Sequence, residues 1–441
     1  MNVLILSANT FAFSPAGPAY IAGAVRDAGH RVEVFDCFVT TDPLRELETC
    51  LNTFQPDVIG ISIRTVAGKI TDPDAELQTI RFDARILVKQ LVEVIRRTSS
   101  AQIVVGGPGF NYYGREWLDY LNLDYGLRGE AEFSFPLYLK RLEEGGDIDD
   151  IPGCVFRKGA DILKVPRPRI ENLDDTALPA YELFDLGYYA EKKIAAGIFT
   201  KRGCAFRCTF CPYSSLEGTR YRLKSPERVV DEIVHIQQAG PVALFDFCDN
   251  SFNVPKAHAE AICREIMTRN LEIAWSTGGL KPIGITDDMC WLFKNSGCTG
   301  LGLAVESASE TMLKSMHRGY RVEQVTQALS CLERSGIPYG VSVMIGAPGE
   351  TPDTISETFA VIDRFPSLSW LWVSIGLNLW THHQAVLKDA RRDGQLRDDD
   401  NLFDEVNYIS PELPKAYMLD LIASLKQREN CYFQVNKLCA E

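Results

Sequence analysis

The sequence predicts an α/β protein with two parallel β-sheets, an open N-terminal sheet and a partial (β/α)6 barrel of the TIM type. Two observations predict this fold class. Short apolar runs alternate with amphipathic segments over residues 1–150, and the same alternation returns over residues 193–385. This pattern is typical of parallel sheets whose faces are covered by helices. The length of 441 residues is sufficient for two to three domains, each with its own core.

The N-terminal sheet is expected to be Rossmann-like, of the flavodoxin type. Its strands are predicted at residues 3–7, 31–35, 58–63, 102–105 and 125–127. The clearest helices between them are predicted at residues 17–28 and 80–97. Ligands of such sheets bind where the strands end at their carboxyl termini. The loops at which we expect a ligand are therefore residues 8–14, 64–68 and 106–110.

The rest of the chain is expected to contain a linker, the barrel and a tail. Four prolines over residues 151–192 indicate a short hairpin and linker. The tail, residues 386–441, begins with a charged stretch and is expected to be helical, with a last helix over residues 414–429. The six barrel strands are predicted at residues 195–200, 242–247, 272–276, 300–305, 339–345 and 370–377.

Composition narrows the classes of partner. The 46 Lys and Arg residues against 59 Asp and Glu give a net charge of −13, which disfavours nucleic acid as a substrate. No apolar run reaches the ~18 residues of a membrane span, and the first residues read as a strand rather than a signal peptide. Thirteen cysteines without a paired pattern fit a reducing compartment. We therefore expect a cytoplasmic protein that binds neither nucleic acid nor a membrane.

The clearest chemical signal follows the first barrel strand. Cys204, Cys208 and Cys211 have the spacing C-x3-C-x2-C. Three thiolates this close in sequence can bind three corners of a [4Fe–4S] cluster. The fourth iron then has no protein ligand and is free to bind a small molecule.

Other readings of the triplet are less favourable. A structural zinc site needs a fourth ligand, and the next candidate, His235, lies a helix away. A ferredoxin-type cluster would use a fourth cysteine, and none follows in the same loop. A disulfide pairing leaves one of three cysteines over.

The triplet resembles the signature of the radical S-adenosylmethionine (SAM) superfamily, C-x3-C-x-aromatic-C, with Phe210 as the aromatic residue. In that family the amino and carboxylate groups of SAM bind the unique iron. One electron from the reduced cluster then cleaves the sulfonium to give a 5′-deoxyadenosyl radical. A non-enzymatic iron–sulfur sensor is the alternative, and it would not cleave SAM.

The resemblance also implies SAM-binding residues at the ends of the barrel strands. The segment Asp246–Phe252 is similar to an aspartate-rich segment near the SAM amino group, and 345–350 is similar to the adenine-side G-x-x-G-E. Polar groups collect at these strand ends in barrels of this kind. The residues implied are Phe210, Tyr213, Asp249, Asn250, Glu306, Ser307, Gly346, Gly349 and Glu350.

A second resemblance covers the N-terminal domain. The segments 14–30, 56–62, 104–108 and 128–132 are similar, in this order, to the cobalamin-binding domain fused to many radical SAM enzymes. The resemblance implies that Ser62, Gly106 and Gly107 contact cobalamin. The D-x-H-x-x-G motif that supplies an axial histidine is absent, and His30 precedes a strand. The alternative is a degenerate Rossmann-like domain that binds no cofactor.

Together the resemblances imply cobalamin-dependent C-methylation of a small molecule of the secondary-metabolite type. The alternative is a cobalamin-free radical dehydratase, epimerase or cyclase that acts on a sugar-like substrate. A methylthiotransferase would need N-terminal cluster cysteines in matching loops, which the chain lacks. A flavodoxin- or ferredoxin-type protein is the expected electron donor. The catalytic residues are unknown, with Lys281, Tyr339 and His382 as candidates near strand ends.

Overall fold

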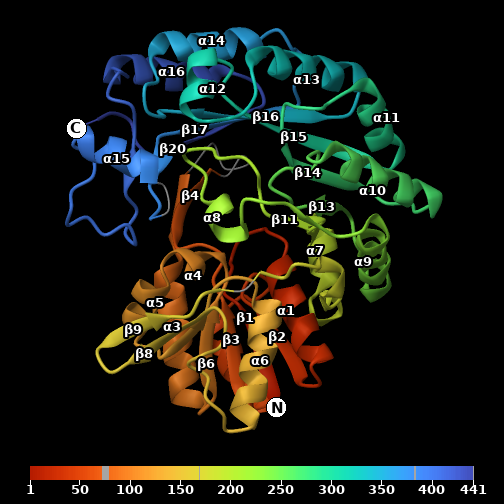
Figure 1. Ribbon diagram of the computed structural model, residues 1–441, viewed down its shortest axis with the longest axis vertical. Helices are drawn as coiled ribbons and strands as arrows, with labels where there is room; N and C mark the ends of the chain where they lie inside the picture. Colours follow the sequence, from red (N-terminus) through yellow and green to blue (C-terminus); the bar gives the residue numbers. More distant parts are fainter. Residues whose placement is uncertain (72–78, 168, 382–383, 441) are drawn as a thin grey trace. The chain divides into compact units, whose positions relative to one another are not determined.

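The computed structural model describes residues 1–71, 79–167, 169–381 and 384–440, without the side chains of residues 67–82 and 384. The chain forms two compact units, which are described separately (Figure 1). The first consists of Met1–Gly68, Asp83–Ile198 and Asp231–Phe245, and the second of Lys69–Phe82, Phe199–Val230 and Asp246–Glu441. The domain bounds given above, 1–150, 151–192, 193–385 and 386–441, stay predictions.

The sheet of the first unit confirms the predicted flavodoxin-type arrangement. Its strand order is β2-β1-β3-β6-β7-β8-β9, and the first five strands pair in parallel. The hairpin predicted in the linker is present, and its two strands extend this sheet in antiparallel fashion. The strands are β1 (Asn2–Ser7), β2 (Arg31–Asp36), β3 (Val58–Ser62), β6 (Gln102–Gly106), β7 (Tyr125–Leu127), β8 (Cys154–Lys158) and β9 (Asp161–Lys164).

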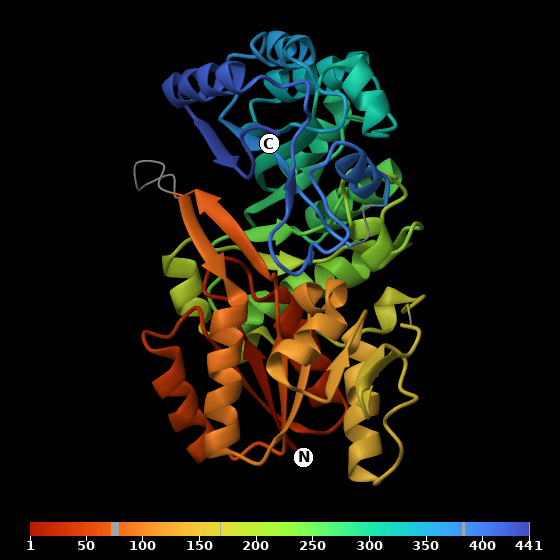
Figure 2. The same ribbon diagram turned by 90° about the vertical axis from the view of Figure 1, so that its left-hand side faces the viewer.

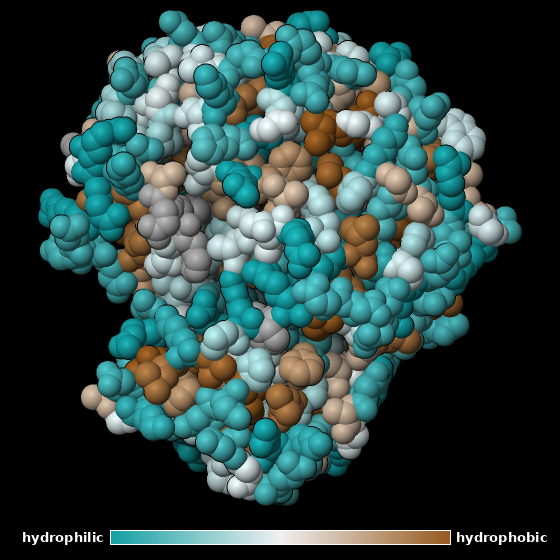
Figure 3. Space-filling model, in the orientation of Figure 1, coloured by the Kyte–Doolittle hydropathy of each residue, from teal (hydrophilic) through white to brown (hydrophobic). Residues whose placement is uncertain are grey.

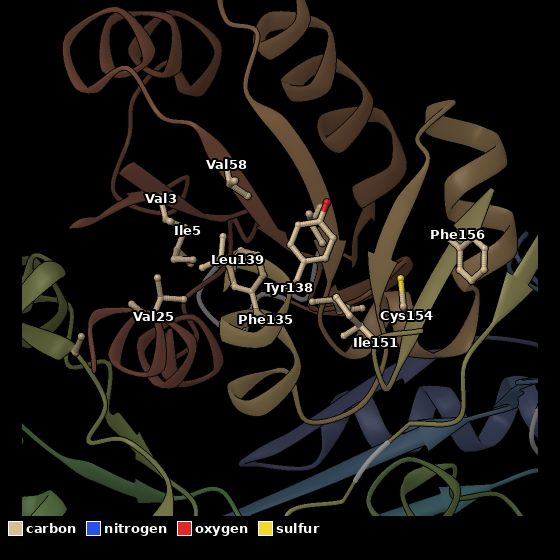
Figure 4. Packing of buried hydrophobic residues seen from close by; sticks show 14 residues of the cluster. Val3, Ile5, Val25, Val58, Phe135, Tyr138, Leu139, Ile151, Cys154 and Phe156 are labelled. Atoms are coloured by element: carbon tan, nitrogen blue, oxygen red, sulfur yellow. The ribbon is translucent and has the colours of Figure 1, made fainter. Parts of the chain in front are cut away.

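Helices cover this sheet, and α1 and α6 share one apolar core with its strands. Gly60 of β3 leaves room for this packing, since a Cβ there would lie 3.0 Å from the Phe135 ring. Core residues labelled in Figure 4 are Val3, Ile5, Val25, Val58, Phe135, Tyr138, Leu139, Ile151, Cys154 and Phe156. The helices are α1 (Ala16–Asp27), α2 (Pro43–Phe54), α3 (Ala84–Thr98), α4 (Pro108–Tyr112), α5 (Gly114–Leu121), α6 (Ala131–Glu143) and α7 (Leu186–Glu191), with 3-10 turns at Leu173–Asp175 and Tyr181–Leu183.

One predicted helix begins later than expected. Residues 80–83 belong to β5 (Thr79–Asp83), which forms a two-stranded ribbon with β4 (Ala67–Thr71) (Figure 2). The helix α3 starts at Ala84 because the Asp83 carboxylate caps it, accepting a hydrogen bond from the Arg85 amide at 2.9 Å. The β-branched and aromatic residues before the cap favour a strand.

The second sheet contains all six predicted barrel strands in sequence order, β10-β13-β14-β15-β16-β17, and a seventh strand, β20. Neighbours from β14 to β20 pair in parallel. The helices α10, α11, α13 and α14 lie along the outside of these strands (Figure 1). The strands are β10 (Ala196–Ile198), β13 (Phe245–Phe247), β14 (Trp275–Leu280), β15 (Cys298–Glu306), β16 (Tyr339–Ile345), β17 (Trp370–Ile375) and β20 (Cys431–Val435).

The tail contains helices, as predicted, and also a strand that the sequence did not reveal. The tail helix predicted at 414–429 is present, but β20 follows it and pairs with β17. The run Cys431-Tyr-Phe-Gln-Val435 alternates, with Cys431 and Phe433 buried, as a sheet edge requires. Short pairs also form between β11 (Lys201–Arg202) and β12 (Arg222–Leu223), and between β18 (Leu377–Asn378) and β19 (Asn407–Tyr408). The remaining helices are α8 (Tyr213–Glu217), α9 (Pro226–Ala239), α10 (Lys256–Thr268), α11 (Asp287–Asn295), α12 (Glu310–Ser315), α13 (Val322–Ser335), α14 (Pro352–Ile362), α15 (Gln384–Arg392) and α16 (Lys415–Gln427).

The surface is mixed in polarity. On the face shown in Figure 3, hydrophobic residues form separate spots among hydrophilic ones. None of the helices within the described residues combines the length and the apolar character that crossing a membrane requires.

Candidate functional site

The three cysteines lie on one loop between β11 and α8, and backbone contacts fix its shape. The Cys204 amide donates to the Gly218 carbonyl at 2.9 Å, and the Cys211 amide donates to the Cys208 carbonyl at 3.3 Å. Gly203 enters the loop at φ +90°, and a Cβ there would lie 2.0 Å from the Arg220 carbonyl oxygen. The loop therefore presents the three sulfurs in a conformation that only glycine permits at its start.

The arrangement of the thiols fits a cluster better than a single metal ion. Every cysteine of the chain lies within the described residues, and none of them forms a disulfide. Among those residues, no three or more His, Cys, Asp or Glu side chains are grouped to hold one metal ion. A zinc ion needs its ligands to converge on one point, whereas a [4Fe–4S] cluster takes each sulfur on a different iron. The zinc candidate His235 instead faces Glu182, with 4.0 Å between Nε2 and Oε2.

Burial keeps one of these thiols protonated until metal binds. Desolvation raises the pKa of Cys211 to about 12. A thiol that coordinates metal is deprotonated outright, because the metal charge outweighs the loss of hydration. Cys211 is therefore suited to binding a metal and not to acting as a free reactive thiolate.

A buried arginine lies against the cysteine loop, and the sequence did not reveal it. Arg318 is only 1% exposed. Its Nη1 donates a hydrogen bond to the Cys208 sulfur at 3.2 Å. Its Nε donates to the Tyr320 hydroxyl at 2.7 Å, and its Nη2 to the Ala304 carbonyl at 2.5 Å. Because Arg318 follows a short helix and no motif surrounds it, only its three-dimensional neighbours identify it.

Glu306 ends β15 at the same place. Its backbone has φ +64°, the left-handed region, next to a register shift in the pairing of β15 with β16. Its carboxylate lies 4.0 Å from Arg318 Nη2 and is partly exposed. The sequence predicts a polar partner for this carboxylate, and the structure places a guanidinium there. A non-glycine residue in this backbone region is typical of functional sites.

Lys281 follows β14 and is also buried among these groups. Its residue is 9% exposed, and its ammonium lies 5.7 Å from the centre of the Phe206 ring. Burial lowers its pKa, as does the charge of Arg318, against the opposing charges of Cys208 and Glu306. Within the part of the chain that the structure describes, the ammonium has no hydrogen-bond acceptor. A buried ammonium of this kind calls for an anionic ligand.

Asp249 follows β13 and is held by contacts within the second unit. Its side chain is fully buried, accepts from the Thr200 amide at 2.9 Å and lies 3.9 Å from the Lys201 ammonium. The Thr200 hydroxyl also bonds to it. These contacts give Asp249 a structural role, and its contact with SAM stays a prediction. Its neighbour Asn250 donates to Glu217 at 2.8 Å, and Glu217 also accepts from the Gly203 amide, so that Asn250 supports the cysteine loop.

Ser307 is likewise structural. Its side chain is fully buried, and its hydroxyl lies 3.0 Å from the Thr358 hydroxyl of α14. The hydroxyl also accepts from the Ser309 amide at 3.2 Å. Ser307 therefore links the end of β15 to α14, and its contact with SAM stays a prediction.

The G-x-x-G-E turn is built as a glycine turn. Gly346 and Gly349 have φ +102° and +83°, which favours glycine at both positions. The Glu350 carboxylate is buried and accepts from the Gly346 amide at 2.5 Å. Desolvation raises the pKa of Glu350 to about 8. Glu350 therefore shapes the turn from inside, and the glycine backbone is what the turn presents.

The remaining predicted residues are Phe210, Tyr213, Tyr339 and His382, and the first three lie in different places. Phe210 lies against the Arg318 guanidinium, 5.5 Å from its ring centre, whereas Tyr213 is 44% exposed at the start of α8. Tyr339 lies at the amino end of β16 and bonds to Glu333 of α13. Barrel ligands bind at the carboxyl ends of strands, which is the opposite end of β16, and a catalytic role of Tyr339 stays a prediction. His382 lies outside the described residues.

In the first unit, the residues predicted to contact cobalamin lie together at the carboxyl edge of the sheet. Ser7, Ser62 and Gly106 lie side by side in register at the carboxyl ends of β1, β3 and β6. Gly107 has φ +93°, and a Cβ there would lie 2.6 Å from the Ile63 carbonyl oxygen. Gly107 therefore packs closely against the backbone of Ile63, and this edge carries small residues at the carboxyl ends of the strands, where ligands of such sheets bind.

Comparison with known proteins identifies both halves of the chain. Residues 198–362 match the radical SAM superfamily, and residues 3–139 match the B12 binding domain. An uncharacterized methyltransferase of Pyrococcus horikoshii is 26% identical over 78% of this chain and 72% of its own length. The anaerobic magnesium-protoporphyrin IX monomethyl ester cyclase of Rubrivivax gelatinosus is 25% identical over 78% of this chain. The chain spans only 61% of that relative.

A solved structure has the same fold. The radical S-adenosylmethionine methyltransferase TsrM of Kitasatospora setae, whose structure holds cobalamin and a [4Fe–4S] cluster, aligns with a TM-score of 0.82. The alignment covers 98% of this chain and 91% of that one at 20% identity. The likeness extends over both units of the chain.

Proposed function

The chain belongs to the radical SAM superfamily, in the branch with an N-terminal B12-binding domain, and on this premise we propose that it is a cobalamin-dependent methyltransferase of a small molecule. The single observation that carries the proposal is that functional groups from separate elements come together at the strand ends of the second unit. There the cysteine loop, the Glu306 carboxylate and the Lys281 ammonium meet around Arg318. The match to a B12 binding domain favours methylation over the cobalamin-free alternative.

Some residues of the site would contact the cluster or SAM, and others hold the loops that carry these residues. Cys204, Cys208 and Cys211 would hold the cluster. Glu306 would accept a hydrogen bond from the amino group or a ribose hydroxyl of SAM, and Lys281 would pair with a carboxylate of SAM or of the substrate. Asp249, Asn250, Ser307 and Glu350 hold the loops that carry these groups.

When bound, the cluster supplies the electron that cleaves SAM, and cobalamin supplies the methyl group. The protein's part is orientation: charge-assisted hydrogen bonds from buried groups fix the ends of SAM, and burial excludes water from the reacting atoms. At the edge of the first unit, Ser62, Gly106 and Gly107 would contact cobalamin. An external flavodoxin- or ferredoxin-type protein would supply the electron, and the free cysteines fit the reducing cytoplasm.

Anaerobic reconstitution with iron, sulfide and cobalamin tests the proposal. We expect one [4Fe–4S] cluster and one cobalt per chain. With dithionite and SAM that carries a labelled methyl group, the protein should release 5′-deoxyadenosine, and the label should appear on cobalamin. The matched control is the Cys204→Ala, Cys208→Ala, Cys211→Ala triple variant, which should bind cobalamin but neither form a cluster nor cleave SAM.

Two results would contradict the proposal in different ways. A preparation with a cluster and SAM cleavage but no cobalt would restore the cobalamin-free dehydratase, epimerase or cyclase. A preparation with a cluster that never cleaves SAM with any reductant would favour the sensor.

A further inference from the structure

Arg318 is unusual because its charge is buried and only partly compensated. Its guanidinium makes three hydrogen bonds, to the Tyr320 hydroxyl, the Ala304 carbonyl and the Cys208 sulfur. The ion pair that the described residues give it is with Glu306, at 4.0 Å and without a hydrogen bond. Removing a charge from water is costly unless a counter-charge lies in direct contact.

The contact with Cys208 explains this deficit. A neutral thiol is a weak hydrogen-bond acceptor, and an N–H group aimed at it gains little. A thiolate bound to a cluster carries negative charge, so the same 3.2 Å contact becomes a charge-assisted hydrogen bond. The buried guanidinium is therefore paired fully only when the cysteine loop holds a cluster.

The surroundings keep Arg318 in this position. Its Nε is anchored by the Tyr320 hydroxyl, which itself donates to the Ala304 carbonyl at 2.9 Å. The Phe210 ring lies 5.5 Å from the guanidinium carbon, and the Lys281 ammonium is close enough for the two positive charges to interact. The guanidinium is thus held against Cys208 by a rigid frame rather than by a flexible surface contact.

We propose that Arg318 is a positioning residue that raises the reduction potential of the cluster by donating a hydrogen bond to the Cys208 sulfur. Reduction adds one electron to the cluster, and a fixed positive charge with a hydrogen bond to a sulfur ligand stabilises the more negative state. The electron comes from an external one-electron donor, for which dithionite stands in. The inference rests on the proposed function in requiring that the loop binds a [4Fe–4S] cluster.

The test is a redox titration of the whole reconstituted chain, without SAM or cobalamin. The fraction of reduced cluster at each potential is measured from its electron paramagnetic resonance signal. Arg318→Gln removes the charge and keeps a planar polar group. We expect its cluster to be at least tenfold harder to reduce, which corresponds to about 59 mV for one electron. Arg318→Lys keeps the positive charge but loses the planar set of N–H donors of the guanidinium. Its reduction potential should shift in the same direction by a smaller amount.

Two further variants make the result decisive. Lys314→Gln removes an exposed cation from the nearby helix α12 and should leave the potential unchanged, because solvent screens surface charges. Tyr320→Phe loses the anchor of Nε but no charge, and decides the question if Arg318→Gln does not fold. Its potential should fall by less than that of Arg318→Gln.

The possible failures are distinguishable. A wild-type protein that takes up no cluster overturns the proposed function. A loaded Arg318→Gln protein, or failing that a loaded Tyr320→Phe protein, with the potential of Lys314→Gln overturns the role of Arg318 alone.

Discussion

At the scale of single residues, Glu306 combines an unfavourable backbone with a partly exposed carboxylate. Its left-handed conformation costs about 1–3 kcal/mol and persists only where surrounding structure requires it. The carboxylate has an ion pair with Arg318 and is partly exposed. We expect Glu306→Gln to lower SAM affinity by about 10- to 100-fold, the scale of a lost hydrogen bond to a charged group. Anaerobic calorimetric titration of the loaded protein measures this.

The control for Glu306→Gln is Glu323→Gln, which changes an exposed carboxyl on α13. Its SAM affinity should equal that of the wild type. Equal affinities of both variants would remove Glu306 from the SAM site.

Glu350 makes stability depend on pH in an unusual direction. Burial raises its pKa from 4.5 to about 8 in the folded protein. Between these values the folded state keeps a proton that the unfolded state has lost, so stability falls as pH rises through this window. Glu350→Gln should lose this dependence because the amide stays neutral, and its oxygen can still accept from the Gly346 amide.

Thermal unfolding from pH 5 to pH 8.5 measures the effect of Glu350. The melting temperature of the wild type, relative to that of Glu350→Gln, should decline across this range. Glu323→Gln provides the matched carboxyl control and should follow the wild type. A constant difference between wild type and Glu350→Gln would mean that the Glu350 side chain is ionised throughout.

The residues of the site could be predicted only where local sequence determines them. Cys204, Cys208 and Cys211 share one loop, so their spacing alone indicates a cluster. Arg318 reaches Cys208 across 110 positions, and no local pattern encodes that contact. Sequence likewise places Asp249 and Glu306 at strand ends but cannot tell which of them packs inward.

At the scale of elements, the cysteine loop depends on its entry at Gly203. A side chain there would need both a left-handed backbone and the space of the Arg220 carbonyl oxygen. We expect Gly203→Ala to lose most of its cluster, because the loop must shift by more than a rotamer change. Iron per chain after reconstitution measures this.

The matched control is Gly284→Ala. Gly284 has φ +70°, and its nearest neighbour is a flexible lysine side chain 3.9 Å away, so the variant adds backbone strain without a clash. It should cost some stability and keep full iron content. Equal iron content in both variants would show that the loop does not need its glycine.

The elements that sequence predicts well are those with long apolar patterns. The residues of β16 match the prediction because seven consecutive residues are apolar or small, and the turn after them is rich in glycine. The strand β20 was missed because it is short and follows a helix, and its pairing with β17 is a long-range contact. The start of α3 was misplaced because the helical period runs on through Asp83, where capping decides the boundary.

At the scale of the whole molecule, the six histidines determine what ligation cobalamin can have. His30 precedes β2, and Arg31 pairs with Asn2 at the amino ends of the strands. The cofactor edge of the sheet is the opposite one, where Ser7, Ser62 and Gly106 lie. The His30 ring contacts the N-terminal amine at 3.4 Å and Glu143 at 3.5 Å. It therefore lies at the amino edge of the sheet.

We therefore expect cobalamin to bind stoichiometrically without a histidine ligand from this domain. The ultraviolet–visible spectrum should be that of base-off, histidine-off cobalamin, and the Co(II) resonance should show no splitting from an axial nitrogen. His30→Ala and His235→Ala, which change the histidines of the first unit, should leave both spectra and the cobalt count unchanged. A nitrogen splitting that disappears in either variant would contradict this prediction, since it would require a histidine to reach an edge from which the fold of the first unit keeps it away.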